Sequence, residues 1–139
     1  MTVVEVAVSF ANDMLRIKGL EVRNFRKFES YSVEFDQQLT VLVGDNGTGK
    51  STLIDAACVA LGSLFHGIEH AKAPSLMPDD ARGAVIRQGD AIVVQPQYPV
   101  AVEACGIALG DEISWTRSLN GPKGRTTRVD AAPIIEAGK

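Results

Sequence analysis

The residues whose types and spacing most strongly indicate chemistry lie at positions 44–51, which read Gly-Asp-Asn-Gly-Thr-Gly-Lys-Ser. They match the pattern G-x-x-x-x-G-K-[ST] of a phosphate-binding loop in full. Glycines 44, 47 and 49 allow backbone conformations that side chains disfavour, so that successive N–H groups can point at an anion. We expect Lys50 to reach the β- and γ-phosphates of a nucleotide as a point charge, and the Ser51 hydroxyl to ligate Mg²⁺.

The segments on both sides of the loop are those that this motif requires. Residues 39–43 are nearly continuously apolar and β-branched, which predicts a strand buried on both faces. Apolar residues then recur at helical spacing, which predicts a helix from about Lys50 to Leu61 with Gly62 as its C-terminal cap. The N-terminus of that helix adds about half a positive charge facing the phosphates. The alternative, a glycine-rich turn with a chance lysine, does not explain these flanks.

The other expected elements are mainly strands. Residues 15–23 alternate in polarity with a phase break at Gly19, which predicts a strand with a bulge. Further strands are expected at residues 31–35, 91–95, 100–109 and 112–119, the last two joined by a hairpin turn at Gly110-Asp111. Residues 63–80 read mainly as loop, and residues 131–137 as the start of a helix. The sequence therefore predicts an α/β fold.

Composition sets the remaining limits. The chain of 139 residues has 45% hydrophobic and 22% charged residues, which suits one packed domain. Its net charge of −3 gives no overall attraction to nucleic acid. No membrane-spanning stretch or signal peptide is evident, and Cys58 and Cys105 are interpreted as reduced core residues, so a cytoplasmic protein is expected. Residues 1–13 are interpreted as an N-terminal extension and residues 14–139 as the domain.

Three segments together carry a resemblance to a known family. Residues 20–28 (LEVRNFRKF), 33–35 (VEF) and 39–55, which include the loop, resemble the N-terminal head segment of RecF/SMC-type ATPases. They are more closely similar to bacterial AAA-type, ABC-like ATP-binding proteins, some of which serve in anti-phage defence. The resemblance implies a P-loop NTPase N-terminal half, with a mixed sheet, one phosphate-loop helix and an outer antiparallel hairpin layer that ends in Trp115-x-Arg117. The segment Asp80-Ala-Arg82 resembles a family motif to which we assign no role.

The resemblance also implies ligands and partners. ATP and Mg²⁺ are the expected cofactors, and the expected partner is the C-terminal half of the head or a second head in a homodimer. DNA is a further partner implied for the complete protein, and no membrane is implied. Arg26, with the Lys27 backbone, is expected to contact phosphate or ribose, the alternative being a solvated turn. The predicted nucleotide-binding residues are therefore Arg26, Lys27, Asn46, Gly47, Thr48, Gly49, Lys50, Ser51 and Thr52, with Ser51 also at the metal.

One part of such an ATPase site is missing from the sequence. Hydrolysis needs an apolar strand ending in Asp-Glu, the Walker B motif, whose carboxylates hold Mg²⁺ and polarise water. The nearest mimic, residues 100–103 ending in Glu103, is better explained as a hairpin strand, and Gln88 is misplaced for the family's glutamine loop. We therefore assign no catalytic residue and interpret the chain as incomplete at its C-terminus. It is expected to bind ATP, with hydrolysis only in the complete protein; the alternative is a non-catalytic, nucleotide-gated interaction module.

Two further sequence patterns suggest other functions, one a zinc site and the other contact with DNA. Residues 66–70 match H-x-x-E-H, an inverted zinc-peptidase motif, but Gly67 weakens a helix there and a third ligand is not marked. An exposed loop or helix end is the favoured interpretation. Lys123, Arg125 and Arg128 form a basic cluster that could contact a DNA backbone, although a solvated hairpin end is the simpler explanation.

Overall fold

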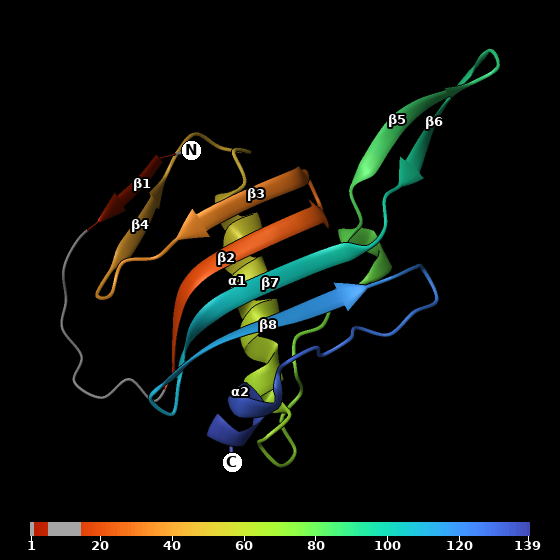
Figure 1. The fold of residues 1–139 in the computed structure, drawn as a ribbon. Helices are drawn as coiled ribbons and strands as arrows, with labels where there is room; N and C mark the ends of the chain where they lie inside the picture. The colour runs from red at the N-terminus through yellow and green to blue at the C-terminus, as the bar shows by residue number, and fades with distance from the viewer. Residues whose placement is uncertain (1, 6–14) are drawn as a thin grey trace.

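The computed structural model describes residues 2–5 and 15–139 of the chain, and the fold is α/β (Figure 1). Its elements follow in chain order: β1 Thr2–Glu5, β2 Leu15–Phe25, β3 Phe28–Glu34, β4 Thr40–Val43, α1 Lys50–Phe65, the 3₁₀ turn η1 Pro78–Asp80, β5 Gly83–Gln88, β6 Ala91–Pro96, β7 Val100–Ala108, β8 Asp111–Leu119 and α2 Ala132–Ala137. Most of the predicted extension, residues 6–13, lies outside the described residues. Because Thr2–Glu5 pairs with β4, part of that extension joins the fold, while the boundary at residue 14 stays a prediction.

A four-stranded antiparallel sheet, in the order β3-β2-β7-β8, forms the body of the molecule. The pairing of β2 with β7 shifts register between Ile17 and Gly19, which confirms the predicted bulge. The predicted antiparallel layer is therefore present, with β7 and β8 as its outer hairpin. Their turn is one residue earlier than predicted: Ala108 pairs with Asp111, and Leu109 and Gly110 are the central residues, with φ of 53° and 88°.

Helix α1 crosses the back of this sheet and closes the core (Figure 1). Its buried residues, among them Leu53, Ala56 and Val59, pack with sheet residues such as Val22 and Val102. The helix continues to Phe65, so Gly62 is not the cap that we predicted. A Cβ at Gly62 would lie 2.5 Å from the Pro74 carbonyl oxygen, so glycine is needed for close approach rather than for helix termination.

The strand before the loop differs most from expectation. We predicted residues 39–43 near the centre of a mixed sheet and buried on both faces, and this is wrong. Among the described strands β4 pairs only with β1, Val43 is 49% exposed, and every strand pair is antiparallel. The reason is connectivity: after α1 the chain enters the β5–β6 hairpin instead of returning a parallel strand beside β4.

Three smaller expectations concern the remaining elements, the two cysteines and membrane-spanning helices. The predicted strand at residues 91–95 is β6, and the predicted helix start is α2, whereas β5 was not predicted. Cys58 is exposed and Cys105 is partly exposed, so neither is the core residue that we expected; Cys58 lies on an uncovered side of α1. No helix in the described part of the chain is long and apolar enough to cross a membrane.

Candidate functional site

The glycine-rich loop connects β4 directly to the first turn of α1. Gly47 and Gly49 have φ of 79° and 106°, the left-handed region that glycine tolerates best. Gly44 is not in that region, so the predicted need for glycine there is not explained by a positive φ. The Thr48 hydroxyl donates to the Asp45 carbonyl at 2.8 Å and closes the loop on itself. The Leu53 N–H then donates to the Gly49 carbonyl at 3.0 Å, which begins the helix.

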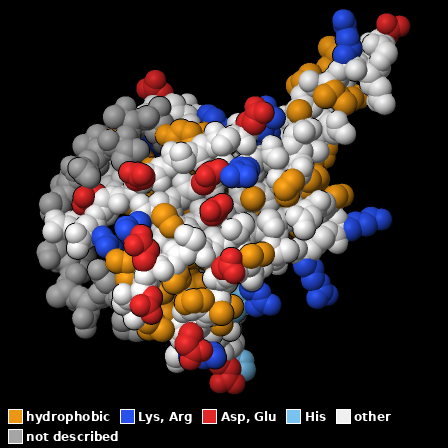
Figure 2. All heavy atoms as spheres, in the orientation of Figure 1, with side chains coloured by type: hydrophobic (Ala, Val, Ile, Leu, Met, Phe, Trp, Pro, Cys, Tyr) orange, Lys and Arg blue, Asp and Glu red, His pale blue; other side chains and the backbone are white. Residues whose placement is uncertain are grey.

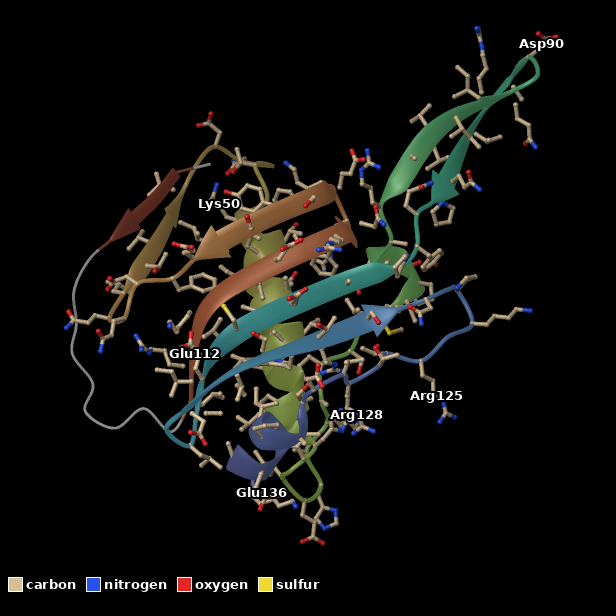
Figure 3. The ribbon with its side chains drawn as sticks, viewed as in Figure 1. Lys50, Asp90, Glu112, Arg125, Arg128 and Glu136 are labelled. Carbon is tan, nitrogen blue, oxygen red and sulfur yellow. The ribbon has the colours of Figure 1, made fainter. Side chains whose placement is uncertain are left out.

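Two ammonium groups converge on the loop from different elements. Lys50 Nζ donates to the carbonyls of Gly44 and Asp45, the latter at 2.7 Å. Lys27 Nζ, from the turn between β2 and β3, donates to the Gly47 carbonyl. The expected contact of the Lys27 backbone with the ligand stays a prediction; in this structure the Lys27 side chain reaches the loop. Both cations are thus positioned where an anion on the loop would meet them (Lys50 is labelled in Figure 3).

A cavity of about 260 Å³ marks this convergence. It is lined by Lys27, Asn46, Gly47, Gly49, Lys50, Ser51 and Thr52. Of the predicted nucleotide-binding residues, only Arg26 and Thr48 are not in its lining. Backbone N–H groups at a helix start, two ammonium groups and two hydroxyls form a donor set that fits a polyphosphate, and the Ser51 hydroxyl is an oxygen ligand of the kind Mg²⁺ accepts.

Arg26 has a different environment from the one we expected. Its guanidinium donates to Asp55 on α1 and, through Nε at 3.0 Å, to Asp80 in η1. Burial lowers the pKa of Arg26, but hydrogen bonds and charge from these two carboxylates outweigh it and raise the pKa overall. A contact between Arg26 and nucleotide stays a prediction; in this structure Arg26 links the β2–β3 turn to α1 and η1.

The segment Asp80-Ala-Arg82, to which no role was assigned from the sequence, holds this turn in place. The Arg26 N–H donates to the Asp80 carbonyl at 2.6 Å, and the Arg82 N–H donates to the Asn24 carbonyl at 2.9 Å. Asp80 also accepts from the Met77 N–H at 2.8 Å and is nearly buried. The segment therefore positions the turn that carries Lys27. Sequence reasoning missed it because the partners lie 54 residues apart.

An apolar groove of about 610 Å³ adjoins the loop, between β4 and α1. Its lining includes Phe35, Leu42 and Ile54, the last 56% exposed. Lys50 and Ser51 line both this groove and the smaller cavity on the loop. Any group that binds in the groove would therefore contact the same residues as a ligand on the loop.

The zinc-peptidase pattern does not acquire the geometry that it needs. His66 caps α1, the following residues form turns, and the side chains of Glu69 and His70 are 89% and 90% exposed. No set of three potential ligands from His, Cys, Asp and Glu gathers anywhere in residues 2–5 and 15–139. Helical presentation of both histidines, on which this motif depends, is not present.

Comparison with known proteins supplies independent information. A family model described as "AAA domain" matches residues 20–137. The DNA replication and repair protein RecF of Leptospira interrogans is 46% identical over 43 residues, which are 31% of this chain and 12% of that protein. The DNA double-strand break repair Rad50 ATPase of Archaeoglobus fulgidus is 28% identical over 126 residues, 91% of this chain and 11% of that protein. The chromosome partition protein Smc of Methanocaldococcus jannaschii is 37% identical over 49 residues, 35% of this chain and 4% of that protein. The matched part of the chain thus spans only 4–12% of the length of these three curated relatives.

Proposed function

The chain belongs to the AAA domain family, with RecF-, Rad50- and SMC-like ATPases among its relatives, and from this membership we propose that it binds ATP with Mg²⁺ on the loop at positions 44–51. The observation that carries the proposal is the cavity on the loop, in which Lys27 and Lys50 meet. Both ammonium groups currently donate to loop carbonyls. Phosphate oxygens are stronger acceptors, so the ammonium groups would exchange these bonds for charge-assisted ones when ATP binds.

Each group in the cavity would make a different contact with ATP or Mg²⁺. Lys50 would contact the β- and γ-phosphates, and Lys27 would add a second positive charge from the β2–β3 turn. N–H groups of residues 47–52 and the start of α1 would surround the phosphate oxygens. The Ser51 hydroxyl would ligate Mg²⁺, which neutralises charge between the phosphates.

The test is an ATP-binding titration of the 139-residue chain by calorimetry, with Mg²⁺ present. Lys50→Ala should weaken ATP binding by at least tenfold, since a charge-assisted hydrogen bond to phosphate contributes about 1.5–3 kcal/mol. The matched control is Lys72→Ala, because Lys72 is an exposed lysine in the loop after α1 and outside the cavity. Unchanged ATP affinity in Lys50→Ala would refute the proposal.

Hydrolysis is proposed only for a complete protein. The Asp55 carboxylate, one turn into α1 from the loop, is paired with Arg26 and does not offer a free base. We therefore propose that a carboxylate from elsewhere in the head, or from a second head, completes the ATPase. The names of the relatives extend the proposal to a protein that handles DNA in repair. The resemblance noted from the sequence adds phage defence as a second context, and a cytoplasmic location stays a prediction.

A second candidate function is a nucleotide-gated interaction module without turnover. The groove beside the loop favours it, because a docked partner and ATP would share Lys50 and Ser51. The partner would be the C-terminal half of the head or a second copy. Sedimentation velocity of the chain with and without ATP tests the form of this module in which the partner is a second copy. Association that requires ATP and is lost in Ile54→Asp supports that form, and ATP-independent sedimentation refutes it.

A further inference from the structure

A second cavity, of about 500 Å³, lies at the opposite end of α1 from the phosphate loop. We call it the basic pocket and define it by the five basic side chains in its lining, His66, Arg117, Lys123, Arg125 and Arg128. Its walls come from the C-terminal cap of α1, strand β8 and the loop that follows β8. Helix α1 has 16 residues and is about 24 Å long at 1.5 Å per residue, so the two cavities are separate sites.

The charge of the basic pocket is not balanced. Among the residues that the structure describes, no aspartate or glutamate lines the cavity. Its three exposed cations, Lys123, Arg125 and Arg128, form no ion pair within the described part of the chain. Figure 3 shows Arg125 and Arg128 reaching out from the loop after β8, and Figure 2 shows blue groups on this side without red neighbours.

Arg117 makes the imbalance more pronounced because it is 99% removed from solvent, with 1% exposure. Its Nη1 donates to the Val59 carbonyl at 3.0 Å and its Nη2 to the Ser75 hydroxyl at 3.4 Å, while Nε has no acceptor in the described residues. A buried cation normally has an acidic partner, since desolvating an unpaired charge costs several kcal/mol. Here neutral acceptors alone hold the guanidinium, and Arg117 is one of the residues that line the cavity.

Two titratable groups of the pocket, Arg117 and His66, have lowered pKa values, chiefly because of burial and in smaller part because of neighbouring positive charge. Burial lowers the pKa of Arg117, and the charge of Arg128 lowers it further. Burial likewise lowers the pKa of His66, and Arg128 and Arg117 add to the effect. The smaller, electrostatic part of each shift comes from positive neighbours alone, as expected for a site that no negative charge balances.

From this geometry we propose that the basic pocket binds a phosphate group. A phosphate has the charge that the cavity lacks, and its tetrahedral oxygens suit several guanidinium donors at once. Thr126 and Ser75 also line the cavity, but their hydroxyls already donate to the carbonyls of Leu76, at 3.2 Å, and Ala73, at 3.4 Å. The basic side chains would therefore supply the donors for the phosphate. The group can come from a free phosphate compound or from the backbone of a nucleic acid, which share this chemistry. The proposal is independent of ATP binding at the loop.

The test is a titration of the 139-residue chain with inorganic phosphate, followed by amide NMR and compared with chloride at equal ionic strength. We expect saturable shifts of the Gly124 and Thr126 amides, distinct from any response of Gly47 and Gly49 in the phosphate loop. Site-resolved signals keep this result separate from the outcome for ATP. Shifts at residues 124–126 that are linear and equal in phosphate and chloride, with no shift from a short DNA duplex, would overturn the proposal.

Variants then identify the groups responsible. Arg128→Ala should weaken phosphate binding in the basic pocket by about tenfold, the loss expected for one charge-assisted contact. Arg125→Ala is the second variant, and Arg87→Ala on the β5–β6 hairpin is the control, being an exposed arginine outside the cavity. The amide spectrum of each variant checks its fold. Equal affinity in Arg128→Ala, Arg125→Ala and Arg87→Ala would refute the assignment.

A final arm distinguishes the two sources of phosphate. A short DNA duplex that shifts the same amides, more tightly than inorganic phosphate and with steep salt dependence, identifies the nucleic-acid backbone. A duplex that leaves those amides unmoved while inorganic phosphate shifts them identifies a free phosphate compound. Failure of both probes to shift these amides overturns the proposal.

Discussion

Replacing Gly62 by alanine has two opposing effects on the free energy of unfolding, one from helix propensity and one from steric contact, and the surroundings of Gly62 determine which is larger. Within a helix, alanine is favoured over glycine by about 1 kcal/mol because the unfolded chain loses less entropy. Gly62 is an interior helix residue, so propensity alone predicts a more stable protein. Against this, a Cβ there would lie 2.5 Å from the Pro74 carbonyl oxygen and 2.6 Å from Nη1 of Arg117.

The steric effect should be the larger one. Overpacking in a buried position costs about 1–3 kcal/mol, and a backbone carbonyl cannot rotate away as a side-chain tip can. Moving the Arg117 guanidinium also weakens its bond to the Val59 carbonyl, and hydrogen bonds of charged groups contribute about 1.5–3 kcal/mol. After subtracting the helix-propensity gain, we expect Gly62→Ala to lower the free energy of unfolding by about 1.5–5 kcal/mol.

Urea denaturation followed by Trp115 fluorescence measures this, since the chain has a single tryptophan whose Nε1 donates to the Ala60 carbonyl at 3.0 Å. Gly121→Ala is the control, because a Cβ at Gly121 would meet no atom within 4 Å. That variant should change the free energy of unfolding by less than about 0.5 kcal/mol. A Gly62→Ala protein as stable as the wild type, or more stable, would show that the loop and Arg117 do not approach the helix as described.

Two further predictions concern the charged groups. Asp80→Ala removes acceptors for Arg26 and for the Met77 N–H and should lower the free energy of unfolding by about 2–3 kcal/mol. Combined with Arg26→Ala in a double-mutant cycle, it should show a coupling of about 1 kcal/mol, limited because Arg26 is 40% exposed; strictly additive effects would contradict the ion pair. Arg128→Ala should raise the pKa of His66 toward its usual value, measured by NMR titration, because the charge of Arg128 disfavours protonation there. The folded state of the wild type binds that proton less readily than the unfolded state, so the free energy of unfolding falls as pH drops below about 6.5. The variant should lose less of its free energy of unfolding over the same pH range. An unchanged pKa of His66 would contradict the proximity of the two groups.

Local sequence determined the elements around the phosphate loop. The glycine spacing and the lysine at position 50 are complete within eight residues, and the helix that follows depends on its own periodicity. The bulge at Gly19 and the β7–β8 hairpin were predicted for the same reason, since alternation and turn residues act over a few positions. Even here the hairpin turn was misplaced by one residue, because positive φ at Leu109 is set by the strand pairing.

Interactions between distant segments were decided only by the tertiary structure. Nothing near Arg26 in the sequence identifies Asp55 and Asp80 as its partners, 29 and 54 residues away. The sequence predicts a helix cap at Gly62, whereas in the structure Pro74 and Arg117 lie against this residue inside the helix. The sequence also predicts a central strand at β4, whereas among the described strands β4 pairs only with β1. The basic pocket likewise forms only when β8 places Arg117 against the Val59 carbonyl of α1. Periodicity and turn chemistry are encoded within a few residues, whereas which surfaces meet depends on the path of the whole chain.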